Sequence, residues 1–447
     1  RCAGGFLWDL MDQGVVRTDK NNYVDCMGNF GADGIVGPHA EKEGSYYTIK
    51  EVWCPVQLTW NDVEKGELTL SNQYNFVNLK DCRFSYRLLQ MPAMGSTQVK
   101  VLKQGNLSSP DVAPGKEAQV KIPMMANADA VEIKAVNHEG EEIMTWSRGV
   151  KSEERRVKNS SAPSTSSAAY ADQADAVEVK AGGRTYRFAK KDGRLMGVEV
   201  GSKAISLSNG PRFMAARRSD RSLDQFYNHD DKEAEKKKTL YTEFVDQGAF
   251  AGFEWKEAEA KLVATYQHGS LDEVDWQFLS DGSVAVTCHY NFGGVVDMMG
   301  MAFDYPESKV RSKAWVGNGP YRVWQNREQG PQYGYWQNDY NDPIPAESWD
   351  YPEFKGYFAN VKWMQFKTDE GKIGFSGLTA DEHMGVYTPR DGRDGLLYTL
   401  PQTGLAVFKV IPSVRNKVNT TDLNGPSAQP KWLNGKGKVE FTLNFEL

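Results

Sequence analysis

The sequence has little that would point to a membrane, a nucleic acid or a disulfide framework. No window of its 447 residues approaches the roughly 18 apolar residues that a membrane-spanning helix requires. Lys and Arg number 53 against 59 Asp and Glu, so there is no basic surplus to neutralise phosphates. The five cysteines form no C-x-x-C pair and favour buried thiols. We therefore expect neither a membrane nor a nucleic acid as a partner.

Common catalytic and metal-binding motifs are missing as well. The six histidines stand apart, without H-E-x-x-H or Cys/His spacing, so each is interpreted as an ordinary surface or core residue. There is no G-x-S-x-G motif and no phosphate-binding glycine loop. Carboxylate pairs remain, at Asp9 with Asp12 and at Asp339 with Asp342, and glycoside hydrolysis needs such a pair. The simpler interpretation is that these four residues belong to turns and caps.

Aromatic residues are plentiful instead, at 12% of the chain, and many stand beside Gly, Asn and Asp. A flat ring can cover the apolar face of a sugar while amides and carboxylates bond its hydroxyls, so such clusters suit either sugar recognition or a β-sandwich core. One cluster, within residues 331–354, is Pro-rich and predicts a loop. Its rings, Trp336 with Tyr335, Tyr340 and Trp349, either meet a sugar site or pack on their own sandwich.

Periodicity predicts a mainly β chain in four parts. Residues 5–8 predict a short buried strand and residues 46–52 a helix of one or two turns, a unit typical of an α/β fold. Beyond them, apolar residues alternate over short segments, as strands do, and Gly317–Pro320 is interpreted as a turn. The predicted parts are an α/β strand-and-helix unit over 1–57, an immunoglobulin-like sandwich over 58–150, a Ser/Ala-rich linker over 151–176 and a large β-sandwich over 177–447.

Several motifs carry a family resemblance. The segments GGFLWDLMDQG, NFGADGIVGP and SYYTIKEVWCPV, within residues 4–56, resemble the end of the catalytic barrel of glycoside hydrolase family 2 β-galactosidases. The later WVGNGPYRVWQNR resembles a signature of that family's small-chain sandwich. The resemblance implies a remnant of a (β/α)8 barrel, an immunoglobulin-like domain and the small-chain sandwich. It also implies that the chain is truncated at its N-terminus and holds no catalytic residue, because both catalytic glutamates of the family lie on earlier barrel strands.

The resemblance further implies roles for individual residues. Trp8 matches the tryptophan of the eighth barrel strand, whose indole stacks on the sugar. Phe30 matches a phenylalanine whose backbone carbonyl binds sodium, and Asp33 stands where the best-known members have an asparagine ligand to the same ion. The replacement leaves open sodium, another ion or none, and the family's magnesium site lies mostly upstream. In those members the sandwich also lends an aromatic residue to the active site, for which Trp336 is a candidate.

The function implied by the resemblance is retaining hydrolysis of terminal β-D-galactosides by the complete enzyme, with this chain alone inactive. The expected partners are a β-galactoside or related glycan and, because large members of the family assemble, further copies of the chain. The alternative is a noncatalytic carbohydrate-binding or assembly module. A periplasmic or extracytoplasmic parent follows only by analogy with polysaccharide-degrading relatives.

Overall fold

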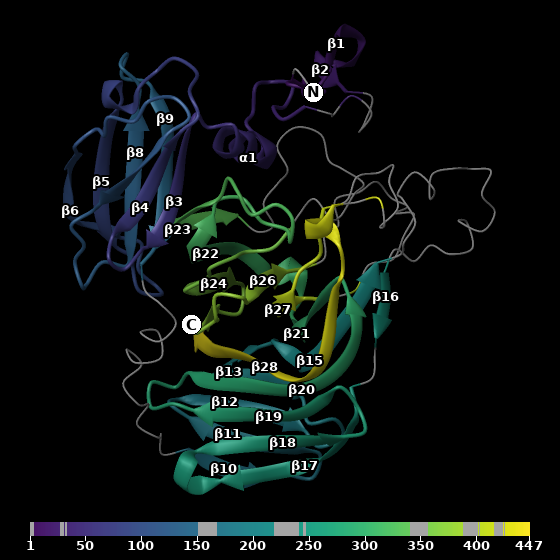
Figure 1. Ribbon diagram of the computed structural model, residues 1–447. Coiled ribbons are helices and arrows are strands. Elements are labelled where there is room, and N and C mark those ends of the chain that lie inside the picture. The colour runs from purple at the N-terminus through teal and green to yellow at the C-terminus, as the bar shows by residue number, and fades with distance from the viewer. Residues whose placement is uncertain are drawn as a thin grey trace.

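The computed structural model describes residues 4–26, 31, 34–150, 168–218, 241–244, 247–339, 356–387, 401, 403–414, 423 and 425–447. These residues are almost entirely β, which confirms the predicted fold class. Figure 1 shows the three parts that they form, an N-terminal segment, a smaller sandwich and a larger one. In the described ranges no helix has the length and apolar character needed to span a bilayer.

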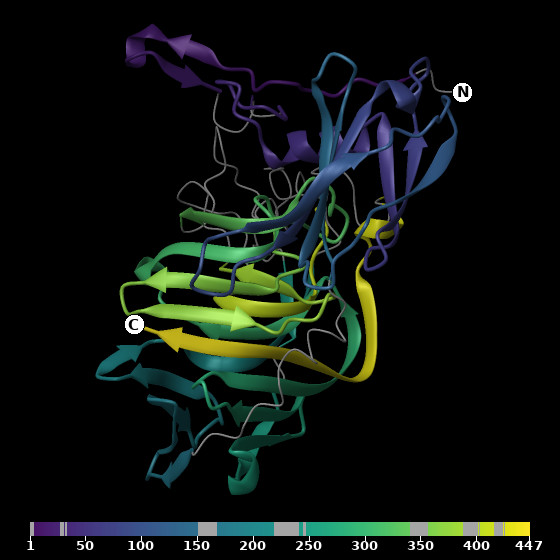
Figure 2. The same ribbon diagram turned by 90° about the vertical axis from the view of Figure 1, so that its left-hand side faces the viewer.

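The N-terminal segment contains a small hairpin and one α-helix. The hairpin pairs β1, Val15–Arg17, with β2, Tyr23–Asp25, and the helix α1 covers Gly44–Val52, as predicted near residues 46–52. The prediction of a buried strand at residues 5–8 is wrong, because no strand forms there and the side chains of Phe6 and Trp8 are 104% and 81% exposed. Figure 2 shows the hairpin extending well beyond the two sandwiches.

The smaller sandwich is immunoglobulin-like. Apolar residues from its two antiparallel sheets, such as Leu70 from one and Ile133 from the other, meet in one core. Alternation explains the packing, because every second residue of each strand faces this core. Among the described residues the sheets are β3–β4–β7 and β6–β5–β8–β9. Their strands are β3 Val56–Asp62, β4 Glu67–Asn72, β5 Arg83–Gln90, β6 Lys100–Leu107, β7 Glu117–Lys121, β8 Ala130–Val136 and β9 Glu142–Gly149.

The larger sandwich stacks two extensive antiparallel sheets. Within the described ranges, a ten-stranded sheet runs β10–β11–β12–β13–β15–β21–β27–β26, with β14 beside β13 and β16 beside β15. These strands are β10 Ala169–Asp172, β11 Ala176–Ala181, β12 Arg184–Ala189, β13 Leu195–Val200, β14 Lys203–Ile205, β15 Ser208–Arg218, β16 Tyr241–Phe244, β21 Met298–Asp304, β26 His383–Val386 and β27 Leu405–Val410. Because β10 belongs to this sheet, the sandwich begins before residue 177, inside the range predicted as a linker.

The second large sheet has nine strands in the described part of the chain, in the order β17–β18–β19–β20–β28–β25–β24–β22–β23. Phe188 of one sheet packs edge-on against Trp276 of the other, with ring centroids 4.8 Å apart, at the centre of the shared core. The strands are β17 Ala249–Lys256, β18 Lys261–Gln267, β19 Leu271–Phe278, β20 Val284–Val296, β22 Val310–Gly319, β23 Gln332–Asp339, β24 Trp363–Thr368, β25 Lys372–Ser376 and β28 Lys431–Glu446.

Two local predictions fail in this sheet. Gly317 to Gly319 form the end of strand β22 and not a turn, and residues 332–339 form its partner β23 and not a loop. The glycines have a packing reason, because a Cβ on Gly319 would lie 2.6 Å from the indole of Trp336. Glycine here permits two strands and a bulky ring to approach closely.

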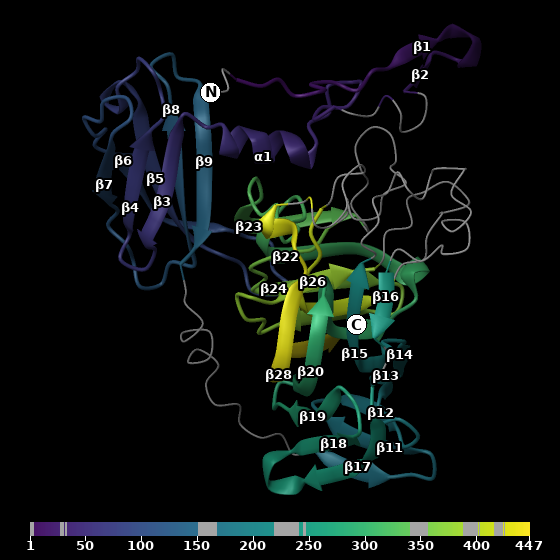
Figure 3. The same cartoon turned by 45° about the vertical axis from the view of Figure 1, so that its right-hand side comes forward.

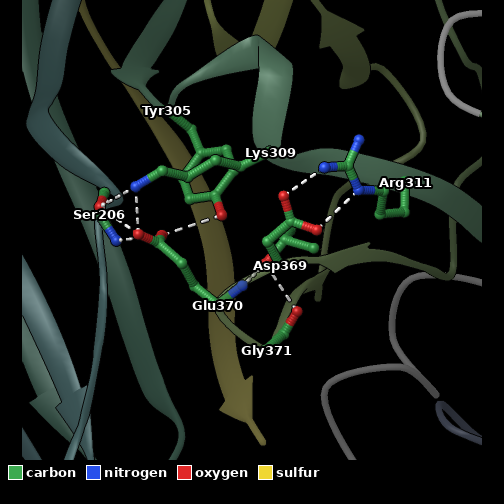
Figure 4. A network of polar contacts seen from close by, with 8 residues as sticks. Ser206, Tyr305, Lys309, Arg311, Asp369, Glu370 and Gly371 are labelled. Carbon is green, nitrogen blue, oxygen red and sulfur yellow. Dashed lines mark hydrogen bonds and ion pairs between the residues drawn. The ribbon is translucent and has the colours of Figure 1, made fainter.

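A partly buried polar network ties the two large sheets together (Figure 4). The carboxylate of Glu370, in the turn between β24 and β25, accepts hydrogen bonds from the backbone N–H of Ser206 at 2.9 Å, its hydroxyl at 2.7 Å and the Tyr305 hydroxyl at 3.0 Å. Lys309 pairs with the same carboxylate. Ser206 and Tyr305 follow strands of the ten-stranded sheet, so the network joins both layers.

The two sandwiches meet at a mixed apolar and polar junction. Tyr333 and Trp363 of the larger sandwich pack against Leu89 and Met91 of the smaller one. The Trp363 indole N–H donates to the carbonyl oxygen of Pro92 at 2.9 Å. Figure 3 shows α1 lying beside this junction, between the immunoglobulin-like strands and the larger sandwich.

Candidate functional site

Trp8, in the N-terminal segment, is exposed to solvent. Its neighbours Asp9 and Asp12 serve the local backbone: Asp9 accepts from the N–H of Leu10 at 2.5 Å and Asp12 from that of Gly34 at 2.8 Å. Asp9 therefore bonds within its own turn, while Asp12 ties this segment to the loop at Gly34, 22 residues further along the chain. Phe30 and Asp33, predicted as sugar and sodium ligands, lie outside the described residues, so both assignments stay predictions.

The helix α1 anchors the N-terminal segment to the larger sandwich. Tyr47 stacks on Tyr321 with ring centroids 4.8 Å apart. The Thr48 hydroxyl donates to the Gln329 carbonyl at 3.0 Å, and the backbone N–H of Gly330 donates to the Glu51 carboxylate at 2.6 Å. Burial raises the pKa of Glu51, although the bond from Gly330 opposes the shift. These contacts hold α1 against the larger sandwich, and α1 follows the segment that carries Trp8.

A titratable group lies where α1 begins. Burial raises the pKa of Glu43 to about 7, and the nearby carboxylate of Asp12 adds to the effect. The Arg327 guanidinium opposes it, while burial lowers the pKa of Arg327 itself to about 10. Glu43 is therefore partly protonated near neutral pH, at the contact between the N-terminal segment and the sandwich.

A cleft of about 520 Å³ opens at the junction of α1 and the two sandwiches. This size lies within the range of small-ligand sites, which often form between domains. Its lining combines aromatic rings, an apolar floor and charges of both signs. The residues that give it this character are Tyr47, Lys50, Arg87, Glu132, Glu142, Tyr335 and Trp336, together with Leu89, Val99 and Val101.

The charged residues of this junction cleft form pairs. Arg87 donates two hydrogen bonds of 2.7 Å to the carboxylate of Glu132, in a planar fork. Lys50 donates to Glu142 at 2.9 Å. Burial would raise the pKa of Glu142, but the bonds from Lys50 and Lys134 outweigh it and lower that pKa. Glu142 is thus ionised at neutral pH and suits hydroxyl recognition better than proton donation.

Trp336 lines this cleft from strand β23, and its ring also packs against the core of its own sandwich. Its indole N–H donates to the Gly317 carbonyl at 3.1 Å, and the half-buried ring packs against the large core. Tyr335, the preceding residue, points to the opposite face because side chains alternate along a strand. Tyr335 packs toward Trp363, with ring centroids 6.1 Å apart.

The second predicted carboxylate pair is not brought together in the described residues. Asp339 is exposed at the end of β23, and its backbone carbonyl accepts from Lys313 at 3.3 Å. Asp342, Tyr340 and Trp349 lie outside the described residues. Sequence reasoning missed Arg87, Glu132 and Tyr47, which come from three separate elements and share no local motif.

The fold is that of a two-domain β protein, in which an immunoglobulin-like sandwich packs on a larger sandwich of two extended antiparallel sheets. Within that class, the family model of the β-galactosidase small chain matches residues 180–407, and the model of β-galactosidase domain 4 matches residues 68–146. The chain belongs to the β-galactosidase small-chain family.

Two β-galactosidases agree with this assignment. A β-galactosidase from Oenococcus oeni is 19% identical over 478 aligned positions, which cover 97% of this chain and 44% of that protein. A β-galactosidase from Pectobacterium atrosepticum is 30% identical over 87 positions, covering 17% of this chain and 8% of that protein. The chain thus spans less than half of the length of either relative. A galactose 1-epimerase structure from Lactobacillus acidophilus overlays 63% of this chain and 98% of its own at 9% identity, with a TM-score of 0.33.

Proposed function

We propose that this chain is the C-terminal portion of a glycoside hydrolase family 2 β-galactosidase and contributes the substrate wall and the structural support of the complete enzyme. The observation that carries the proposal is the alignment of 97% of this chain with only 44% of a β-galactosidase. In the proposed complete enzyme, residues outside this chain supply the acid and the nucleophile that hydrolyse terminal β-D-galactosides with retention.

The exposed N-terminal segment supports this assignment. Phe6, Trp8 and Leu10 expose most of their apolar surface, and surfaces of this kind mark an interface. In the proposed enzyme they complete the catalytic barrel, and the Trp8 indole covers the apolar face of the galactose ring. The α1 contacts with the sandwich hold this segment in position.

The ion predicted for this region fits the donor chemistry of the sequence. The Phe30 carbonyl and the Asp33 carboxylate offer oxygen atoms, which hard cations such as sodium prefer. When bound, such an ion would neutralise negative charge beside the sugar. The proposed work of this chain's own residues is to bind the sugar, through Trp8, and to orient it.

Hydrolysis of a chromogenic β-galactoside tests the proposal directly. We expect no turnover by this chain alone and turnover by a version extended upstream to the full reading frame. In the extended protein, Trp8→Ala should lower kcat/KM at least tenfold, a loss of about 1.4 kcal/mol of transition-state binding. Trp432→Ala, which removes another largely exposed ring, on β28, serves as the control and should leave kcat/KM unchanged.

Turnover by the short chain that disappears with Asp339→Asn or Asp342→Asn would contradict this proposal, because the active site would then lie in the sandwich.

The junction cleft favours a second function, noncatalytic binding of a carbohydrate. Its exposed valines and Tyr335 offer an apolar surface, while Arg87, Glu132 and Glu142 offer hydrogen-bond partners for hydroxyls. Because the cleft needs both sandwiches, binding should require both of them.

Calorimetric titration of this chain with lactose tests the second function. We expect saturable binding that weakens at least tenfold with Arg87→Ala or Tyr335→Ala. Trp432→Ala again serves as the control and should bind as the parent does. Equal binding by the parent and Arg87→Ala would contradict a carbohydrate site in this cleft.

A further inference from the structure

Three potential metal ligands gather on the outer face of the nine-stranded sheet, well apart from the junction cleft. Glu273 and Asp275 stand two residues apart on β19, and His289 stands on the neighbouring strand β20. The alternate residues Val274, Trp276 and Cys288 face the buried core, so the three polar side chains project from the opposite face.

Strand pairing holds these side chains together. Glu273 lies directly across from His289 in the β19–β20 register, and Asp275 lies across from Thr287, two residue pairs further along. Directly opposite residues on paired strands have neighbouring side chains. Each of the three offers one ligand atom, and these atoms all lie within 4.8 Å of one another. All three side chains are half-buried. The paired strands fix their backbones, and partial burial restricts their side-chain conformations.

One carboxylate oxygen of Asp275 lacks a hydrogen-bond donor. Asp275 Oδ2 lies 3.4 Å from Lys261 Nζ, but Asp275 Oδ1 is buried and has no hydrogen-bond donor. A buried oxygen without a donor destabilises the fold, and a bound cation would give it a partner. Glu259 also pairs with Lys261, at 3.2 Å. With Lys261 counted, Glu259, Glu273 and Asp275 leave this patch with a net negative charge that attracts a cation.

We propose that Glu273, Asp275 and His289 bind one divalent transition-metal ion, with Zn²⁺ as the reference ion. Two carboxylates and one imidazole form a mixed oxygen and nitrogen donor set, which suits Zn²⁺ and similar ions. Three protein ligands leave a fourth position of a tetrahedral ion for water. Mg²⁺ and Ca²⁺ prefer all-oxygen sites, so the imidazole favours the transition metals over them. The site is independent of the proposed glycosidase chemistry.

The test uses the chain without any histidine tag, because a tag would bind the same ions. Calorimetric titration with Zn²⁺ should show one ion bound per chain and a higher Tm on binding. His289→Gln and Asp275→Asn should each weaken binding at least tenfold, since each removes a ligand. His268→Gln is the matched control, because His268 is an exposed histidine at the turn between β18 and β19 of the same sheet.

Two further measurements sharpen the assignment. Lys261→Met removes the competing cation from Asp275 and should tighten Zn²⁺ binding. Titration with Co²⁺ should give visible absorption bands of a nitrogen-containing site, and His289→Gln should abolish them. Unchanged Tm values of the metal-free variants show that the sheet still folds. The proposal is overturned if Zn²⁺ does not saturate the chain at millimolar concentration, if His268→Gln weakens binding as much as His289→Gln, or if Mg²⁺ binds equally well.

Discussion

Glu370 illustrates how single residues hold the two large sheets together. Burial would raise the pKa of its carboxyl group, but the bonds from Lys309, Ser206 and Tyr305 outweigh burial and lower the pKa from 4.5 to about 2. A carboxyl group whose pKa is lower in the folded state stabilises the fold above its unfolded pKa. This stabilisation is therefore fully present above about pH 5 and is lost as the pH falls toward 2.

Replacing Glu370 tests this network. Glu370→Gln should lower the free energy of unfolding by about 1–2 kcal/mol at pH 7, and the difference from the parent should shrink between pH 5 and pH 2. Urea unfolding at several pH values measures it. Asp369→Asn is the control, because the adjacent Asp369–Arg311 pair is about half exposed and should contribute little. A pH-independent loss in Glu370→Gln would contradict the role of its charge.

At the scale of elements, strand β24 joins the two sandwiches through one buried ring. Trp363 is 4% exposed, contacts the apolar residues of the junction and donates to Pro92 of the smaller sandwich. Ser147 of β9 adds a second link, donating its hydroxyl to the Tyr333 carbonyl at 2.6 Å. Removing the ring therefore removes both apolar packing and a hydrogen bond at the contact between domains.

Truncation of this ring should be costly. Trp363→Ala should lower the free energy of unfolding by about 3–5 kcal/mol, as for other buried aromatic side chains. Trp363→Phe should lose less, because most of the packing remains while the bond to Pro92 is lost. Urea unfolding followed by circular dichroism measures both, with Trp432→Ala as the exposed control. A cost for Trp363→Ala no larger than that of Trp432→Ala would show that the junction does not depend on this ring.

At the scale of the whole molecule, each sandwich has its own hydrophobic core. Cys82 is buried in the core of the smaller sandwich, and Cys288 is buried in that of the larger one. Chains with separate cores commonly depart from two-state unfolding. The two thiols therefore report on different parts of the protein.

Thiol labelling should reveal two unfolding transitions. With rising urea, Cys82 and Cys288 should become reactive at different concentrations, as read by mass spectrometry after a short pulse of a thiol reagent. Trp363→Ala should widen the interval between the two midpoints, because it weakens the junction that couples the sandwiches. Coincident midpoints in the parent would instead show that the sandwiches unfold as one cooperative unit.

Local sequence patterns predicted the secondary-structure elements better than they predicted which residues are buried. The alternation around Val274 and Trp276 identifies a strand because side-chain direction along a strand is a local property. The apolar pattern at residues 5–8 indicates a buried strand, yet Trp8 is exposed, since burial depends on what another part of the molecule places against a residue. The strand at Gly317–Gly319 was missed because glycine also suits turns, and its use here depends on the distant ring of Trp336.

The mainly β class, the helix of the N-terminal segment and, through the motifs, the resemblance to β-galactosidases follow from the amino-acid sequence, because short-range periodicity and fixed spacing carry that information. Which side chains meet depends on the folding of distant segments against one another. Arg87 and Tyr335 face one cleft because two sandwiches dock, and Glu273, Asp275 and His289 converge because strand pairing sets their register. Docking and register depend on contacts between distant segments, which no local pattern specifies.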